Sequence, residues 1–163
     1  MKKRLLSMLG AIVMILGVMY VPMNEVKAAE SNRCVDSSFL TQQEESTGSY
    51  MSKARGIYML QGDCSISKAG RHRIYVAGST TANMVVPRIR VVMYVEEYIA
   101  EDDAWSQIDS WDVTDTDTYY ISTSKSIVVT GGTYYRVGAE HQCAPLDDSG
   151  DTGFSFTDGI WID

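Results

Sequence analysis

The sequence is poor in the residues on which most enzymes and metal proteins depend. Its 163 residues include two histidines, three cysteines and three prolines. It contains no Gly-x-Ser-x-Gly motif, no His-Glu-x-x-His motif and no glycine-rich phosphate loop, which are the signatures of common hydrolases and nucleotide-binding proteins. We therefore expect a protein that is not an enzyme and that carries no cofactor.

The overall composition excludes several other classes. Hydrophobic residues make up 45% of the chain and charged residues 21%, which is too apolar for a disordered protein. There is no collagen-like repeat and no sustained heptad pattern, and no window carries an apolar stripe with a helical period. The length fits one folded domain.

The first 28 residues have the features of a secretory signal peptide. A basic start (Lys2, Lys3 and Arg4) precedes an apolar run at 5–23, and a Val-x-Ala cleavage site ends at Ala28. The alternative is an uncleaved membrane anchor, since the apolar run approaches the roughly 20 residues that span a bilayer. We favour cleavage and a secreted protein.

Removal of this segment makes the remaining chain strongly acidic. Residues 29–163 contain 10 basic and 20 acidic side chains, a formal charge of −10. A surface of this charge repels nucleic acid and anionic lipid headgroups, so we expect neither a nucleic-acid partner nor membrane binding after cleavage. Divalent cations and basic partners fit it better.

The segment 88–97 has the clearest strand pattern. Ile89, Val91, Met93 and Val95 alternate with mostly polar residues, as in a strand with one buried face. An acidic turn at 101–103 and a second strand-like segment at 104–113 complete a hairpin. Further short segments rich in Val, Ile, Thr and Tyr follow, separated by polar turns.

This pattern predicts an all-β protein, an antiparallel β-sandwich with an immunoglobulin-like or fibronectin-like Greek key. Tyr134 and Tyr135 follow a Gly-Gly turn, which is typical of a tyrosine corner in such sandwiches. We assign 1–28 to the signal peptide, 29–54 to a loosely structured N-terminal arm with one candidate strand at 38–41, and 55–163 to the sandwich.

The three cysteines lie in the exported part of the chain, where thiols tend to pair. In an immunoglobulin-like topology, the start of the first strand and the end of the sixth meet at one pole, so we predict a disulfide between Cys64 and Cys143. Cys34 with Cys143 is the alternative pairing. An unpaired Cys34 could link a dimer.

Cys143 also shares a strand face with His141 two residues earlier. A zinc site with Cys64 and His72, or a Cys-His nucleophile, could use these two side chains if the fold brought them together. The more economical interpretation is one structural histidine beside a disulfide, with no metal site.

Two tryptophans and two tyrosines form the candidate ligand site. Trp105 and Trp111 are six residues apart, so a regular strand places both on one face, and Tyr94 and Tyr98 lie on the expected partner strand. Aromatic rings on a sheet face can stack on sugar rings. Alternatively, one tryptophan fills the core and the other lies at its rim.

Two acidic loops are weaker candidates for calcium. One contains Asp147, Asp148 and Asp151, and the other spans residues 112–117. Calcium takes six to eight oxygen ligands from such carboxylates. Neither loop has the spacing of an EF-hand, and we favour solvated turns that keep the protein soluble as the explanation of both loops.

Several short motifs together resemble those of a known family. They are Gly-Ser-Thr-Thr-Ala at 78–82, Asp-Ser-Trp at 109–111, Tyr-Tyr-Arg-Val at 134–137, and Thr-Asp-Gly-Ile-Trp-Ile at 157–162. The chain resembles a group of small secreted proteins of Gram-positive bacteria that are classified as a domain of unknown function. The resemblance implies a secreted all-β domain, supplies no activity, and does not include the cysteines.

Together, these features predict a secreted, non-catalytic binding module. Its expected ligand is a glycan or a host or cell-surface protein, held by Trp105, Trp111, Tyr94 and Tyr98. The first alternative is a secreted effector of antimicrobial or immunity type that acts as an oligomer. The second is a small enzyme that uses His141.

Overall fold

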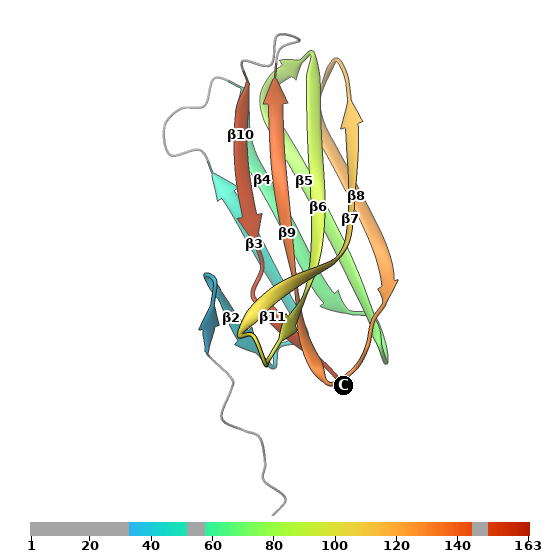
Figure 1. Ribbon diagram of the computed structural model, residues 1–163. Helices are drawn as coiled ribbons and strands as arrows, with labels where there is room; N and C mark the ends of the chain where they lie inside the picture. The colour runs from blue at the N-terminus through green and yellow to red at the C-terminus, as the bar shows by residue number, and fades with distance from the viewer. Residues whose placement is uncertain (1–32, 52–57, 145–149) are drawn as a thin grey trace, which may run out of the picture.

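The computed structural model describes residues 33–51, 58–144 and 150–163, which form two packed β-sheets (Figure 1). The predicted signal peptide lies outside these residues. Within them, no helical segment has the length and hydropathy that crossing a bilayer requires. The strands are β1 (Cys34–Val35), β2 (Ser38–Thr41), β3 (Glu45–Met51), β4 (Met59–Lys68), β5 (Arg73–Val86), β6 (Arg88–Ile99), β7 (Ala104–Asp115), β8 (Thr118–Val128), β9 (Thr133–Ala144), β10 (Asp151–Phe156) and β11 (Gly159–Ile162).

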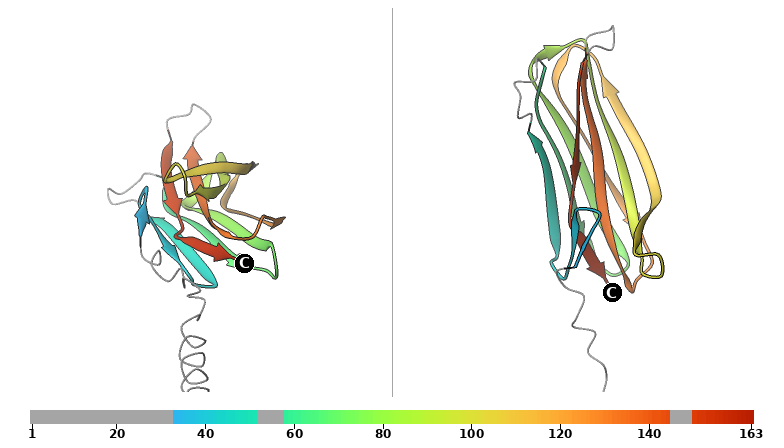
Figure 2. Two further views of the ribbon diagram at one scale, coloured as in Figure 1. Left: turned by 60° about the horizontal axis from the view of Figure 1, so that its bottom comes forward. Right: turned by 60° about the vertical axis from the view of Figure 1, so that its left-hand side comes forward.

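The two sheets are almost entirely antiparallel. Sheet I has the order β1-β2-β11-β9-β6-β7, with β10 also paired to β9, and sheet II has the order β3-β4-β5-β8. Among the described strands, the one parallel pair joins β2 to β11. After the β6–β7 hairpin, the chain crosses to sheet II, where β8 pairs with β5, and then returns so that β9 pairs with β6. These Greek-key connections confirm the predicted antiparallel, immunoglobulin-like β-sandwich (Figure 2).

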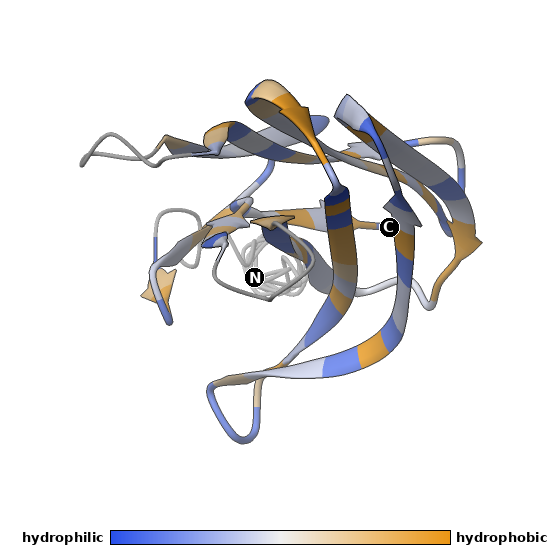
Figure 3. Ribbon diagram, turned by 90° about the horizontal axis from the view of Figure 1, so that it is seen from above, coloured by the Kyte–Doolittle hydropathy of each residue, from blue (hydrophilic) through white to orange (hydrophobic). Residues whose placement is uncertain are grey.

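The main core lies between the sheets, and β6 contributes to it as its alternation predicts. Ile89, Val91, Met93 and Val95 are fully buried, whereas the residues between them are half-buried on the outer face. Figure 3 looks along the strands and shows hydrophobic and hydrophilic residues in alternating bands on the ribbons. The period of two in the sequence therefore corresponds to one face packed against sheet II.

The predicted tyrosine corner is present at the start of β9. The Tyr135 hydroxyl donates a hydrogen bond to the carbonyl oxygen of Thr130 over 2.9 Å. Gly132, between them, has a φ of +89°, a conformation that glycine adopts without a steric penalty. Burial, together with the hydrogen bond to the Glu97 carboxylate, raises the pKa of Tyr135 to about 12, so this hydroxyl stays protonated.

The prediction of a loosely structured arm is wrong for its described residues, 33–51. The candidate strand at 38–41 is confirmed as β2, which joins sheet I, and β3 forms an edge of sheet II. The polar residues of β3 belong to a solvated outer face. Gly48 serves a close approach rather than flexibility, since a Cβ there would lie 2.0 Å from the Phe156 carbonyl oxygen.

A buried arginine attaches the β1–β2 hairpin to sheet I. The Arg136 guanidinium bonds to Glu96 at 2.6 Å, to the carbonyl and carboxylate oxygens of Asp36 at 2.9 and 3.0 Å, and to the Ser38 hydroxyl at 3.0 Å. It also lies 4.6 Å from the centre of the Trp105 ring. Its side chain is only 3% exposed, so these groups provide the hydrogen bonds that water would otherwise supply.

Candidate functional site

The expected platform of two tryptophans on one face does not form, because β7 contains a bulge. Val95 of β6 pairs with Asp109, but the next residue, Glu96, pairs with Gln107. Ile108 is therefore an extra residue, and it reverses the alternation between the two ends of β7. Trp111 and Trp105 consequently lie on opposite faces of sheet I.

Trp111 faces the interior and packs at the edge of the main core. It pairs with the buried Met93, and its indole N–H donates to the Thr123 hydroxyl over 3.0 Å. The Lys125 ammonium lies 5.0 Å from its ring centre. This placement matches the rim position in the alternative interpretation, not the position of a tryptophan that fills the core.

Trp105 belongs to a second apolar cluster on the outer face of sheet I. Its ring centre is 5.6 Å from that of Tyr98, and its indole N–H donates to the Val35 carbonyl oxygen over 3.0 Å. Tyr98 is only 4% exposed and its hydroxyl donates to Asp103. Tyr94 is half-buried, and its hydroxyl donates to Glu140 over 3.3 Å. The structure therefore brings Trp105 and Tyr98 together as packing groups beneath the β1–β2 hairpin.

His141 lies fully buried between the sheets. Its Nδ1 is 2.9 Å from the Thr80 hydroxyl, which itself donates to a backbone carbonyl, so Nδ1 carries the proton. Nε2 then accepts from the Ser155 hydroxyl at 2.8 Å. Burial lowers the pKa of His141 to about 4, although the carboxylates of Asp63 and Glu140 offset part of this shift. His141 is therefore a neutral core residue at neutral pH.

We expect His141 to make the fold sensitive to mild acid. Its folded pKa lies below the ordinary value of 6.5, so its contribution is complete above pH 6.5 and is lost as the pH falls towards 4. Between pH 7 and pH 5, wild type should lose about 2 kcal/mol more unfolding free energy than His141→Gln, which cannot protonate. Urea unfolding of both proteins at the two pH values measures this difference. Equal losses would contradict the assignment.

The predicted disulfide between Cys64 and Cys143 is wrong, and so is the alternative with Cys34, because all three cysteines are free thiols. The Cys64 sulfur lies 3.6 Å from the Val137 carbonyl oxygen, and Cys143 is six residues farther along β9. Six strand residues span roughly 20 Å, far beyond the reach of a disulfide.

Burial raises the pKa of Cys64 to about 11 and that of Cys143 to about 12, so both remain protonated and unreactive. Cys34 is exposed on β1. A dimer linked through it stays a prediction.

The candidate metal ligands have structural partners where they are described. Asp151 accepts hydrogen bonds from the backbone N–H groups of Tyr58 and Met59 at 2.6 and 2.8 Å, and so fixes the start of β4. Asp147 and Asp148 lie outside the described residues. Within the described part of the chain, no group of three or more His, Cys, Asp or Glu side chains is placed to hold a metal ion.

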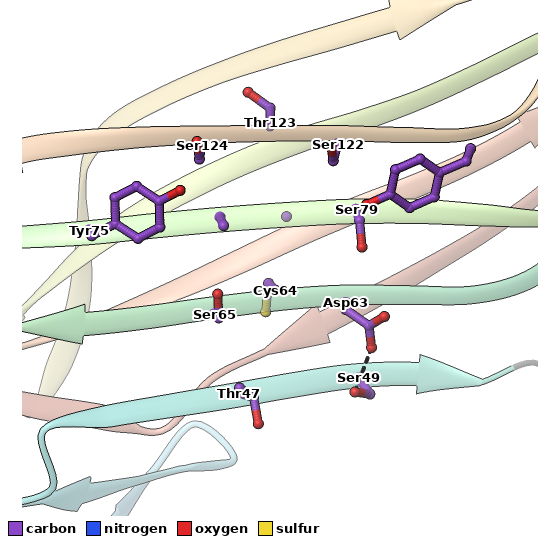
Figure 4. Close-up of a pocket in the computed structure, with 13 residues that line it drawn as sticks. Thr47, Ser49, Asp63, Cys64, Ser65, Tyr75, Ser79, Ser122, Thr123 and Ser124 are labelled. Carbon is purple, nitrogen blue, oxygen red and sulfur yellow. Dashed lines mark hydrogen bonds between the residues drawn. The ribbon is translucent and has the colours of Figure 1, made fainter.

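A shallow groove of about 650 Å³ crosses the outer face of sheet II (Figure 4). Two successive outward-facing rungs of the ladder form its floor, one running from Thr47 to Ser124 and the other from Ser49 to Ser122. Small hydroxyl side chains from all four strands line it, namely Thr47, Ser49, Ser65, Ser79, Ser122 and Ser124. Its surface therefore offers many groups that can both donate and accept hydrogen bonds.

Tyrosine rings border this groove at both ends. Tyr75 of β5 is 44% exposed and Tyr120 of β8 is 47% exposed. Tyr120 pairs with Thr81, six residues beyond Tyr75 on β5, so the backbone positions of the two tyrosines are roughly 20 Å apart along the strands. An extended ligand can contact both rings and the hydroxyl groups between them.

Asp63 lies within the groove and is held by neutral groups. Its carboxylate accepts hydrogen bonds from the Ser49 hydroxyl at 2.7 Å and from the Gln61 amide at 2.8 and 2.9 Å. The dashed line in Figure 4 marks the bond to Ser49. These contacts fix the orientation of the carboxylate without neutralising its charge.

The groove has no obvious signal in the sequence, because its lining contains no tryptophan and only one charged side chain. The available signal was the alternation on β8, where Tyr120, Ser122 and Ser124 share a face, and on β4, where Asp63 and Ser65 do. Each strand resembles an ordinary solvated strand when taken alone. The groove exists only because four such strands are neighbours in one sheet.

Comparisons with known proteins identify a family for this chain but no activity. No curated protein matches the chain. Among solved structures, the chain is similar to the CARDB domain of the PF1109 protein from Pyrococcus furiosus, whose structure was determined in complex with di-metal ions. The two sequences are 14% identical, and the TM-score is 0.31. The match covers 56% of this chain and 78% of that chain.

The model of a family described as a family of unknown function, DUF6147, matches residues 29–157. This match covers most of the sequence that follows the predicted signal peptide. It confirms the resemblance to a domain of unknown function that the short motifs indicate. The chain therefore belongs to the DUF6147 family.

Proposed function

We propose that this protein is a secreted, non-catalytic binding module that holds an extended polysaccharide in the groove on the outer face of sheet II. The observation that carries the proposal is the combination of a hydroxyl-lined floor with an exposed tyrosine at each end. The groove volume of about 650 Å³ lies within the range of ordinary ligand sites.

The chemistry of the groove matches that of a sugar chain. Serine and threonine hydroxyl groups both donate and accept hydrogen bonds, so they suit a ligand whose hydroxyl groups do the same. Tyr75 and Tyr120 offer flat apolar faces with a polar end, which suits stacking against the C–H face of a sugar ring. The residues between them are small, so the groove is open along its length.

The position of the groove favours a sugar chain over a peptide strand. It centres on β4 and β5, whose backbone N–H and C=O groups are already paired on both sides. Peptides that bind to sheets as an added strand need an unpaired edge. A ligand on this face must instead bind through side chains, as a polysaccharide does.

Substitution of either tyrosine should weaken binding. We expect Tyr75→Ala and Tyr120→Ala each to raise the dissociation constant for a bound polysaccharide about tenfold, because each removes one stacking surface of roughly 1 kcal/mol together with its hydroxyl contact. Isothermal titration against soluble β-glucan, xylan, mannan and chitin oligosaccharides, with and without calcium, identifies the polymer and measures the change.

Tyr119→Ala is the matched control. Tyr119 is the neighbour of Tyr120 on β8, is 58% exposed, and does not line the groove. Binding by this variant should equal that of wild type. The proposal fails if no polysaccharide binds, or if Tyr120→Ala binds as tightly as Tyr119→Ala while both remain folded by circular dichroism.

A further inference from the structure

The groove contains one carboxylate among otherwise uncharged side chains, and binding of a neutral sugar chain does not require it. Among the thirteen residues that line it, Asp63 is the one acidic or basic side chain. Within the described part of the chain, the ion pairs involve other carboxylates, such as Glu96, Asp36 and Asp112. Asp63 therefore presents an uncompensated negative charge to whatever occupies the groove.

The carboxylate also retains capacity for a further donor. An ionised carboxylate offers about four acceptor sites, and Ser49 and Gln61 use three of them. Since both neighbours are neutral donors, they orient the group towards a fixed position without reducing its negative charge. Such an arrangement is suited to a cationic group on a ligand.

We propose that the groove selects a polymer of amino sugars with free amino groups, whose ammonium groups bind Asp63, over the same polymer with acetylated nitrogens. This inference rests on the proposed function, because it assigns the sugar class to the same groove. An ammonium group donates charge-assisted hydrogen bonds to the carboxylate, whereas an acetamide is neutral. The formal charge of −10 over residues 29–163 attracts a cationic chain in addition.

The test compares two soluble oligosaccharides of equal length, hexamers of β-1,4-linked glucosamine and of its N-acetylated form. At mildly acidic pH, where the amino groups of the glucosamine hexamer carry their protons, we expect this hexamer to bind wild type at least fivefold more tightly, which is about the effect of one partly exposed ion pair. Asp63→Asn should remove this preference, because it weakens binding of the glucosamine hexamer to about the level of the acetylated hexamer.

Asp102→Asn serves as the control for net charge. Asp102 is exposed in the turn between β6 and β7 of the other sheet, so this substitution removes the same charge at a distance from the groove. The preference for glucosamine should persist in it. Equal loss of preference in both variants would mean that general charge attraction is responsible and would overturn the assignment to Asp63.

The outcomes separate this inference from the proposed function. Equal binding of both hexamers by wild type overturns the selectivity for free amino groups and leaves the polysaccharide groove intact. Failure of both hexamers and of every neutral polysaccharide overturns the groove itself. Hexalysine that competes with the glucosamine hexamer at equal concentration would show that any cationic chain is accepted, and the sugar assignment would be wrong.

Discussion

Gly48→Ala should cost about 3 kcal/mol of unfolding free energy or more. An added Cβ would lie 2.0 Å from the carbonyl oxygen of Phe156 and 2.4 Å from its carbonyl carbon, distances that real Cβ atoms essentially never show. Both atoms belong to the backbone of β10, so no side-chain rotation relieves the contact. The strands β3 and β10, which face each other across this side of the sandwich, would have to separate. Urea unfolding of both proteins measures the cost.

Gly132→Ala is the control, because it adds the same methyl group at a position where there is room for it. Its φ of +89° strains an alanine, yet a Cβ there meets nothing within 4 Å. We expect a loss of about 1–2 kcal/mol from backbone strain alone. Hydrogen exchange should be faster throughout β3 and β10 in Gly48→Ala and unchanged there in Gly132→Ala. A smaller loss at Gly48 than at Gly132 would contradict the close packing of the two strands.

Arg136→Ala should destabilise the fold by about 3 kcal/mol, because it removes one partner of a buried ion pair. Glu96 is 19% exposed and would keep its charge without its guanidinium partner. The contact with Asp36 adds little, since that carboxylate is largely exposed to water. The substitution also removes the cation over the Trp105 ring and the donors that hold the Ser38 hydroxyl.

The β1–β2 hairpin should report this change directly. Trp105 donates to the Val35 carbonyl oxygen of that hairpin, so its fluorescence should shift towards the value for a solvated indole, and residues 33–41 should become sensitive to limited proteolysis. Arg33→Ala, at an exposed pair with Asp103, should cost less than about 1 kcal/mol. If Arg136→Ala behaves like Arg33→Ala, the guanidinium does not hold the hairpin.

Those parts of the fold that depend on local pattern were predictable. The alternation on β6 gave the buried face correctly, and the glycine turn before Tyr135 gave the tyrosine corner. Both depend on the two-residue period of a strand and on the conformational range of glycine. Each signal lies within about ten consecutive residues.

The failed predictions depend on contacts between distant segments. The bulge at Ile108 adds one residue to β7 and so places Trp105 and Trp111 on opposite faces, although the hydrophobic pattern gives no sign of it. The strand β3 is polar because only one of its faces is buried, and its pairing with β4 cannot be deduced from composition. The position of Cys143 relative to Cys64 likewise depends on the register between sheets.

The groove was missed for the same reason. Ser65, Ser79 and Ser122 are ordinary strand residues until the order β4-β5-β8 places them side by side. The alternation of these residues can be seen in the sequence, but which strands lie beside one another in the sheet cannot. The sequence therefore points to the tryptophans as the candidate site, whereas the structure places them in packing positions.

The most direct test of the central claim is an NMR titration of the ¹⁵N-labelled protein with the polysaccharide that binds most tightly. If the groove on sheet II is the binding site, the amide shifts that change with ligand concentration will cluster at Asp63, Ser79 and Ser122, between Tyr75 and Tyr120. The amides around Trp105 and Tyr98 will stay constant. Changes confined to Trp105, Tyr98 and the outer face of sheet I would contradict this account.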